Sequence, residues 1–143
     1  MLILNPERVE FGAALLQRTT AVTIDRATVT PVEQWGATGP WCRLVDSTKR
    51  RVSVTVKQEP GGGPLDAGPA LGAQAELRIV VAPSASDRNR RRVRCTCVVV
   101  GVRDEQPVGK PPLRTVSLLA VSLAAAPLPA GAVDPVVIEE VTP

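Results

Sequence analysis

The sequence predicts an all-β fold, a β-sandwich or β-barrel of six to eight strands with at most one short helix. Valine is the commonest residue and threonine is frequent, and both β-branched side chains favour strands over helices. Several segments alternate apolar and polar residues with the period of a half-buried strand. No amphipathic segment is long enough to predict a stable helix. The 143 residues correspond to a single domain.

The N-terminal part of the chain begins with a short apolar arm at residues 1–7. Residues 8–12 alternate and begin a strand, and residues 21–32 repeat the alternation until Pro31 interrupts it. Residues 33–40 are rich in glycine and proline and predict a turn-rich connection. A short strand is expected next, at residues 41–45.

The clearest strand signal lies at residues 50–57, where every second residue is valine and the intervening residues are polar. Residues 58–74 are so rich in glycine and proline that they exclude a regular element, and residues 75–82 alternate again. We therefore expect a β-hairpin with a long projecting loop at residues 58–74. A loop of this length in a compact domain is usually functional or mobile.

The C-terminal half contains the longest predicted strand, at residues 90–103, followed by a second at residues 113–123. Residues 124–143 form an extended C-terminal segment that is rich in alanine and proline at its start. A final strand with an acidic end is expected within it, at residues 134–142.

The composition excludes many enzyme classes. The chain has no histidine, which excludes Ser-His-Asp and Cys-His catalysis and a histidine-ligated metal site. Its aromatic residues are Phe11, Trp35 and Trp41, too few to predict a base-stacking platform. We expect no catalysis, no metal and no cofactor. No segment resembles an export signal or a membrane span, so synthesis in a cytoplasm without membrane association is expected.

The three cysteines, Cys42, Cys95 and Cys97, are an odd number. On a strand, Cys95 and Cys97 point to the same face about 7 Å apart, a separation that disfavours a bond between them. Their spacing also differs from that of a zinc site. They are therefore small core residues, or one of them pairs with Cys42 within a chain or between neighbouring subunits.

A basic run extends over residues 88–94 and includes Arg90, Arg91, Arg92 and Arg94. Such a run contacts phosphate or an acidic partner, or it is a solvated strand end. No aromatic residue is interleaved with it, so we favour a protein interface or a solvated strand end over nucleic acid. A charged strand also protects a sheet edge from unwanted pairing.

Apolar residues lie on segments that have little to fold against within a small domain. They are Leu2, Ile3 and Leu4 in the N-terminal arm, Leu65 and Leu71 in the loop, and Val136, Val137 and Ile138 near the C-terminus. Exposed apolar residues on extensions usually mark contacts with other chains. The alternative is disordered tails, which are common at chain termini.

Several short motifs are spread along most of the chain: Met1–Gly12, Ile24-Asp25-Arg26, Thr38-Gly39-Pro40-Trp41, Arg91-Arg92-Val93 and Arg114–Ser122. Together they resemble the tail tube proteins of small contractile-tailed bacteriophages. The resemblance implies a β-sandwich or β-barrel protomer that forms hexameric rings, stacked into a hollow tube for the passage of DNA. It also implies a location in the virion, after assembly in the host cytoplasm.

In this family, long loops reach the adjacent ring, which would make residues 58–74 the stacking loop. Its contact residues would be Pro60, Gly61, Gly62, Gly63, Pro64, Leu65 and Leu71. The two terminal segments would also bridge rings, and tail sheath and baseplate proteins would be further partners. DNA would be only non-specific passing cargo, and the acids to consider for the lumen wall are Glu10, Asp25, Glu76 and Glu139.

For the thiols, the hypothesis that follows is a disulfide between subunits, joining Cys42 of one copy to Cys95 or Cys97 of another. Two alternative functions remain open at this point. One is another virion β-module, such as a capsid decoration or baseplate protein. The other is a small β-barrel that binds a small molecule or nucleic acid.

Overall fold

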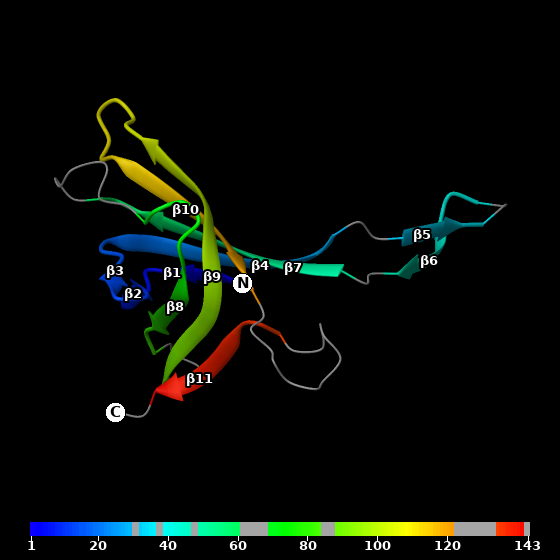
Figure 1. The fold of residues 1–143 in the computed structure, drawn as a ribbon, viewed down its shortest axis with the longest axis horizontal. Coiled ribbons are helices and arrows are strands. Elements are labelled where there is room, and N and C mark those ends of the chain that lie inside the picture. The colour runs from blue at the N-terminus through cyan, green and yellow to red at the C-terminus, as the bar shows by residue number, and fades with distance from the viewer. Residues whose placement is uncertain are drawn as a thin grey trace.

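The structure is a computed structural model that describes residues 1–29, 32–36, 39–46, 49–60, 69–83, 88–121 and 134–141. These residues form strands and turns without a helix, so the all-β prediction is confirmed (Figure 1). The strands are β1 (Leu2–Leu4), β2 (Arg8–Phe11), β3 (Ala14–Leu15), β4 (Thr19–Val29), β5 (Val32–Trp35), β6 (Cys42–Asp46), β7 (Lys49–Gln58), β8 (Gln74–Val81), β9 (Arg90–Glu105), β10 (Leu113–Ala120) and β11 (Val137–Val141). The described residues include no helix with the length and apolarity that a membrane crossing requires.

Nine of the described strands form one antiparallel sheet. Eight of them follow the order β1-β4-β7-β10-β9-β8-β2-β3. The ninth, β11, pairs with the first part of β9, whereas β10 pairs with the later part. This sheet does not close into a barrel. The N-terminal segment nevertheless reaches both of its sides, because β1 pairs with β4 whereas β2 pairs with β8. Between these two ladders, the amide of Asn5 donates to the carbonyl of Thr20 (2.8 Å) and that of Glu7 to the carbonyl of Val80 (2.9 Å).

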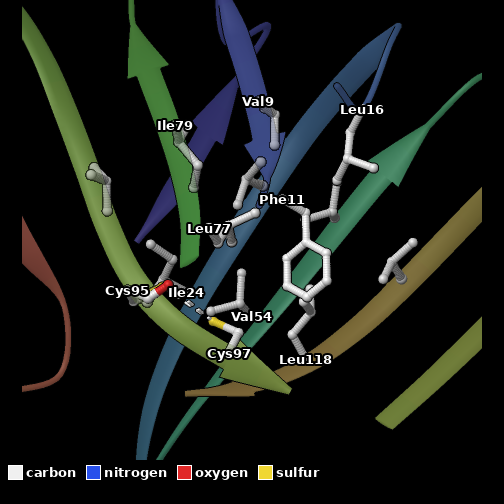
Figure 2. Close-up of a cluster of buried hydrophobic side chains, with 14 of the residues drawn as sticks. Val9, Phe11, Leu16, Ile24, Val54, Leu77, Ile79, Cys95, Cys97 and Leu118 are labelled. Carbon is white, nitrogen blue, oxygen red and sulfur yellow. Dashed lines mark hydrogen bonds between the residues drawn. The ribbon is translucent and has the colours of Figure 1, made fainter. Parts of the chain in front are cut away.

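The core lies on the inner face of this curved sheet, where side chains from β2, β8 and β9 meet those from β4, β7 and β10 (Figure 2). It is almost wholly aliphatic, and Phe11 is the only aromatic residue among the described core residues. The alternation of side chains along each strand determines which residues belong to the core. In β7, Val54 and Val56 are fully buried, whereas Ser53 and Thr55 are only half-buried. The sequence pattern therefore identifies the inward face of β7.

The predicted hairpin between residues 50–57 and 75–82 is wrong. In the sheet, β7 lies between β4 and β10, and β8 lies between β9 and β2, so these two strands do not pair. β8 pairs instead with the next strand along the chain, from Gln74 opposite Val98 to Val81 opposite Arg91. Residues 59–73 consequently connect two non-adjacent strands, and residues 61–68 of the predicted stacking loop lie outside the described residues.

The long hairpin of the structure is formed by β4 and β7. Its ladder runs from Thr19 opposite Gln58 to Val29 opposite Lys49, with a bulge near Ala21. The separate two-stranded ribbon β5–β6 follows at its distal end, over residues that the sequence assigned partly to a turn-rich connection. The β5–β6 ladder lies within the segment that connects β4 to β7, so both pairs join strands that are close in sequence. Pairing strands that are close in sequence has a low entropic cost.

Candidate functional site

A projecting arm is the most distinctive feature of the surface. We define the arm as β5 and β6 together with the distal ends of β4 and β7, residues 25–29 and 49–51. In Figure 1 it extends far beyond the curved sheet that holds the core. Residues 25–28 of β4 are already exposed, whereas Val22 and Ile24 are buried, so the hairpin leaves the core near Asp25. The arm residues whose side chains are described are therefore mostly accessible to another molecule.

Both tryptophans of the protein flank the turn at the tip of the arm. Trp35 ends β5 opposite Cys42, the first residue of β6, and Trp41 directly precedes it. Trp35 is 60% and Trp41 83% exposed. The Cys42 thiol donates to the carbonyl oxygen of Gln34 (3.2 Å) and so helps to hold the two strands at this end. The tip is thus an exposed aromatic surface on a hydrogen-bonded ribbon.

Sequence analysis missed the arm and assigned the projecting role to residues 58–74. A signal was available, because two tryptophans bracket a short segment that contains Gly36, Gly39 and Pro40. Gly39 has a φ of +111°, a backbone conformation that favours glycine and suits the tip of a hairpin. The strand Val32–Trp35 was not predicted, because most of it falls within residues 33–40, which were assigned to a turn-rich connection.

The two terminal segments are strands rather than free arms. β1 is held on β4, and the N-terminal ammonium donates to the carbonyl of Ile24 (2.8 Å). Alternation then buries Ile3 and leaves Leu2 and Leu4 exposed, so the expected exposure of Ile3 is wrong. The same correction applies at the other end of the chain.

In the C-terminal segment, Val136 is buried in the core, whereas Val137 and Ile138 are about half exposed on β11. β11 is fixed by its ladder to β9 and by the carboxylate of Asp134, which accepts a hydrogen bond from the amide of Val136 (3.0 Å). The exposed apolar residues of both ends therefore lie on ordered strands. Leu71 is also exposed, as expected, while Leu65 lies outside the described residues.

The arginines of the basic run are paired with glutamates of neighbouring segments. Within the run, the ion pairs are Arg90–Glu7 (3.2 Å), Arg91–Glu140 (3.1 Å), Arg92–Glu139 (3.3 Å) and Arg94–Glu139 (3.1 Å). Beside the run, Glu10 pairs with Arg78 of β8 (3.2 Å) and with Arg8 of β2. The β9–β11 register places Arg92 opposite Glu139 and Arg91 opposite Glu140, so the acidic residues of β11 neutralise most of these arginines. The run does not present an uncompensated basic surface, which weakens the case for nucleic-acid binding there.

A surface hollow of about 380 Å³ lies within these ion pairs. Its lining residues are Arg8, Glu10, Arg78, Val80 and Arg92. Each of the three arginines has a glutamate partner. Among these lining arginines, only the Nε atom of Arg78 is buried without a hydrogen-bond partner. The hollow therefore does not offer the several converging unpaired donors that an anion site would need.

The cysteines occupy two very different environments. Cys42 lies on the arm, whereas Cys95 and Cys97 are 3% and 0% exposed on the inner face of β9 (Figure 2). Their Sγ atoms are 3.3 Å apart, much closer than their strand positions suggested. Both thiols are covered by the core, so a disulfide from Cys42 of another copy would require the sheet to open. None of the three cysteines forms a disulfide within the chain.

Among the described residues, no group of three or more cysteine and acidic side chains could hold a metal ion. The described surface is distinguished instead by its arm and by apolar residues on strands. No protein-family model and no curated protein matches the chain.

Proposed function

We propose that this protein is a structural subunit that assembles with copies of itself, and that it forms the tail tube of a contractile-tailed bacteriophage. In that role, rings of six subunits stack into a tube through which DNA passes. The observation that most supports self-assembly is the projecting arm with its two exposed tryptophans. The motifs that resemble tail tube proteins supply the more specific identity.

Exposed tryptophans at the end of an arm are well suited to a contact between copies. Each large aromatic side chain buries about 150–250 Å² when it is covered, and tryptophan is enriched among residues that dominate binding energy. Two tryptophans thus contribute about 300–500 Å². A stable interface buries about 800 Å² on each partner, so further surface must take part.

The exposed apolar residues of the terminal strands can supply this further surface. Leu2 and Leu4 lie on β1 and Val137 and Ile138 on β11, and each of these strands has one described neighbour in the sheet. Strands with an unpaired edge readily pair with another chain. A contact between an arm and a different surface of the next copy is head-to-tail, the geometry that generates rings and filaments.

The paired charges on β9 agree with DNA as passing cargo rather than as a bound ligand. Because glutamates compensate Arg90, Arg91, Arg92 and Arg94, these four arginines are less available to hold phosphates. Tight binding would hinder the passage of DNA through a tube. The paired charges therefore support the proposed role.

The test is electron microscopy combined with sedimentation velocity of the purified protein. We expect six-fold rings and tubes from the wild-type chain. The double variant Trp35→Ala/Trp41→Ala should retain its circular dichroism spectrum but fail to form long assemblies, because it loses the aromatic contacts of the arm. The matched control is Val108→Ala, which truncates an apolar side chain that is fully exposed on a different loop.

Dispersed wild-type monomers at high protein concentration would refute self-assembly. Rings that never stack would instead favour a baseplate or capsid decoration protein. Normal tubes from the double variant would show that the tryptophans do not mediate the contact.

A further inference from the structure

Cys95 and Cys97 form a close pair of thiols inside the core. They lie on the same face of β9 with one residue between them, and their side chains lean toward each other until the Sγ atoms are 3.3 Å apart. In Figure 2 the pair lies beside Ile24 and Val54 of the facing strands. The sequence-based expectation that strand geometry keeps the two sulfur atoms apart is therefore wrong, because side-chain rotation brings them together.

The two thiols are not equivalent. The hydrogen bond between them lowers the pKa of Cys95 and, together with burial, raises the pKa of Cys97. Either thiol can donate this hydrogen bond, and once Cys95 is ionised the Cys97 thiol donates it and stabilises the Cys95 thiolate. Because the thiolate is the reactive form, Cys95 is the better nucleophile toward an oxidant, and the adjacent Cys97 is the thiol in position to react with its oxidised form.

We propose that Cys95 and Cys97 are a modification site that closes into an intrachain disulfide when a hydroperoxide reaches it. A small oxidant is required because both thiols are at most 3% exposed. It would enter when the sheet opens locally, as protein structures do with a lower free energy than for global unfolding. The inference concerns these two thiols alone and is independent of the proposed role in a tail tube.

The reaction has two steps. The Cys95 thiolate attacks one peroxide oxygen and the O–O bond breaks, so that Cys95 becomes a sulfenic acid and the departing hydroxide takes the thiol proton. Cys97 then attacks Cys95 Sγ and the S–O bond breaks. The second hydroxide takes the Cys97 proton. Two thiols are oxidised to one disulfide while hydrogen peroxide is reduced to two molecules of water.

Closure of the bond favours a shorter β9 at Thr96. A disulfide brings the two sulfur atoms within about 2 Å of each other and most often holds their Cα atoms about 5.5–6 Å apart. Residues i and i+2 of an extended strand are about 6.6 Å apart, at the long end of the range seen in disulfides. Thr96 is held on both sides, by its pairing with Glu76 on β8 and by the amide of Val121, which donates to its carbonyl (2.8 Å). A bulge at Val100, between Val99 and Gly101, interrupts the β9–β10 ladder nearby and allows the backbone of β9 to adjust.

Oxidation is therefore expected to loosen the strand pairing around Thr96. We expect faster amide hydrogen exchange at Val121 and in the adjoining part of β8 in the oxidised protein. Exchange in β4, which does not pair with β9, should change much less. A strained disulfide of this kind should also be readily reversed by a thiol reductant.

The experiment uses the full-length Cys42→Ser variant, which removes the thiol of the arm and with it any bond between chains through that residue. The folded protein is exposed to hydrogen peroxide, unfolded in the presence of an alkylating agent and analysed by mass spectrometry. We expect the number of alkylated thiols to fall from two to none, with one peptide carrying a Cys95–Cys97 bond that dithiothreitol reverses. Wild-type protein should fall from three thiols to one under short exposure.

The matched control is Cys42→Ser/Cys97→Ala, in which Cys95 has no resolving thiol and should accumulate as sulfenic or sulfinic acid. The Cys42→Ser protein tests the proposal even if this control folds poorly, because it retains both core cysteines. Two intact thiols after an exposure that fully oxidises dithiothreitol in the same solution would overturn the proposal. A Cys95 sulfinic acid with Cys97 still reduced, or disulfide-linked dimers through either residue, would overturn it as well.

Discussion

The curved sheet and the arm use the same secondary structure for opposite purposes. In the sheet, alternation places one face of each strand in a shared aliphatic core, and residues such as Leu77, Ile79 and Val116 are fully buried. In the arm, a two-stranded ribbon carries the largest side chains of the protein into solvent. Isolated two-stranded ribbons are marginally stable, so the arm depends on the hairpin at its base or on a partner. The comparison separates residues that stabilise the fold from residues that are available for assembly.

The largest effect should come from truncating the core. Leu77→Ala should lower the free energy of unfolding by about 2–5 kcal/mol, because it removes buried methyl groups and leaves a cavity. Trp35→Ala should change the stability of the monomer by less than about 0.5 kcal/mol, since its side chain is mostly exposed. Urea unfolding of both variants at low protein concentration measures the difference. Similar losses in the two variants would show that the arm packs on the core.

An intermediate effect is expected at the glycine turn between β2 and β3. Gly12 has a φ of +61°, and a Cβ atom there would lie 3.1 Å from the Cβ of Ala75. Gly12→Ala should therefore cost about 1–3 kcal/mol from backbone strain and crowding together. Gly109→Ala is the matched control, because its φ of +72° gives similar strain with open space around the new methyl group.

Thermal unfolding of the two glycine variants isolates the contribution of crowding. We expect Gly12→Ala to have the lower melting temperature. Equal melting temperatures would mean that Ala75 moves aside without cost and that strain accounts for the whole effect.

The smallest effect should come from the ion pairs between β9 and β11. Glu139→Gln removes the carboxylate that contacts Arg92 and Arg94, yet these side chains are all partly exposed to solvent. The loss should be about 0–1 kcal/mol and should shrink further at high salt, because solvent and ions screen such pairs. Urea unfolding at low and high ionic strength measures it. A loss above that of Leu77→Ala would contradict a minor role for these charges.

Local patterns predicted much of the fold. The alternation in β7, β8, β9 and β10 indicated both the position of each strand and the side chains that face the core. This works because the period of a strand depends only on the backbone of that strand. Ile3 and Val136 are apolar in the sequence, but their burial in the core depended on which strand each terminal segment joined.

The candidate site was predictable only in part. The sequence alone determined the all-β class, the absence of histidine chemistry and the presence of two tryptophans beside a glycine-containing turn. The tertiary structure decided that β7 pairs with β10 rather than β8, that glutamates neutralise the arginines of β9, and that the two thiols meet in the core. These three features depend on contacts between residues distant in the chain or on side-chain rotation. A local periodicity carries no information about either, because it repeats identically whichever strand lies alongside.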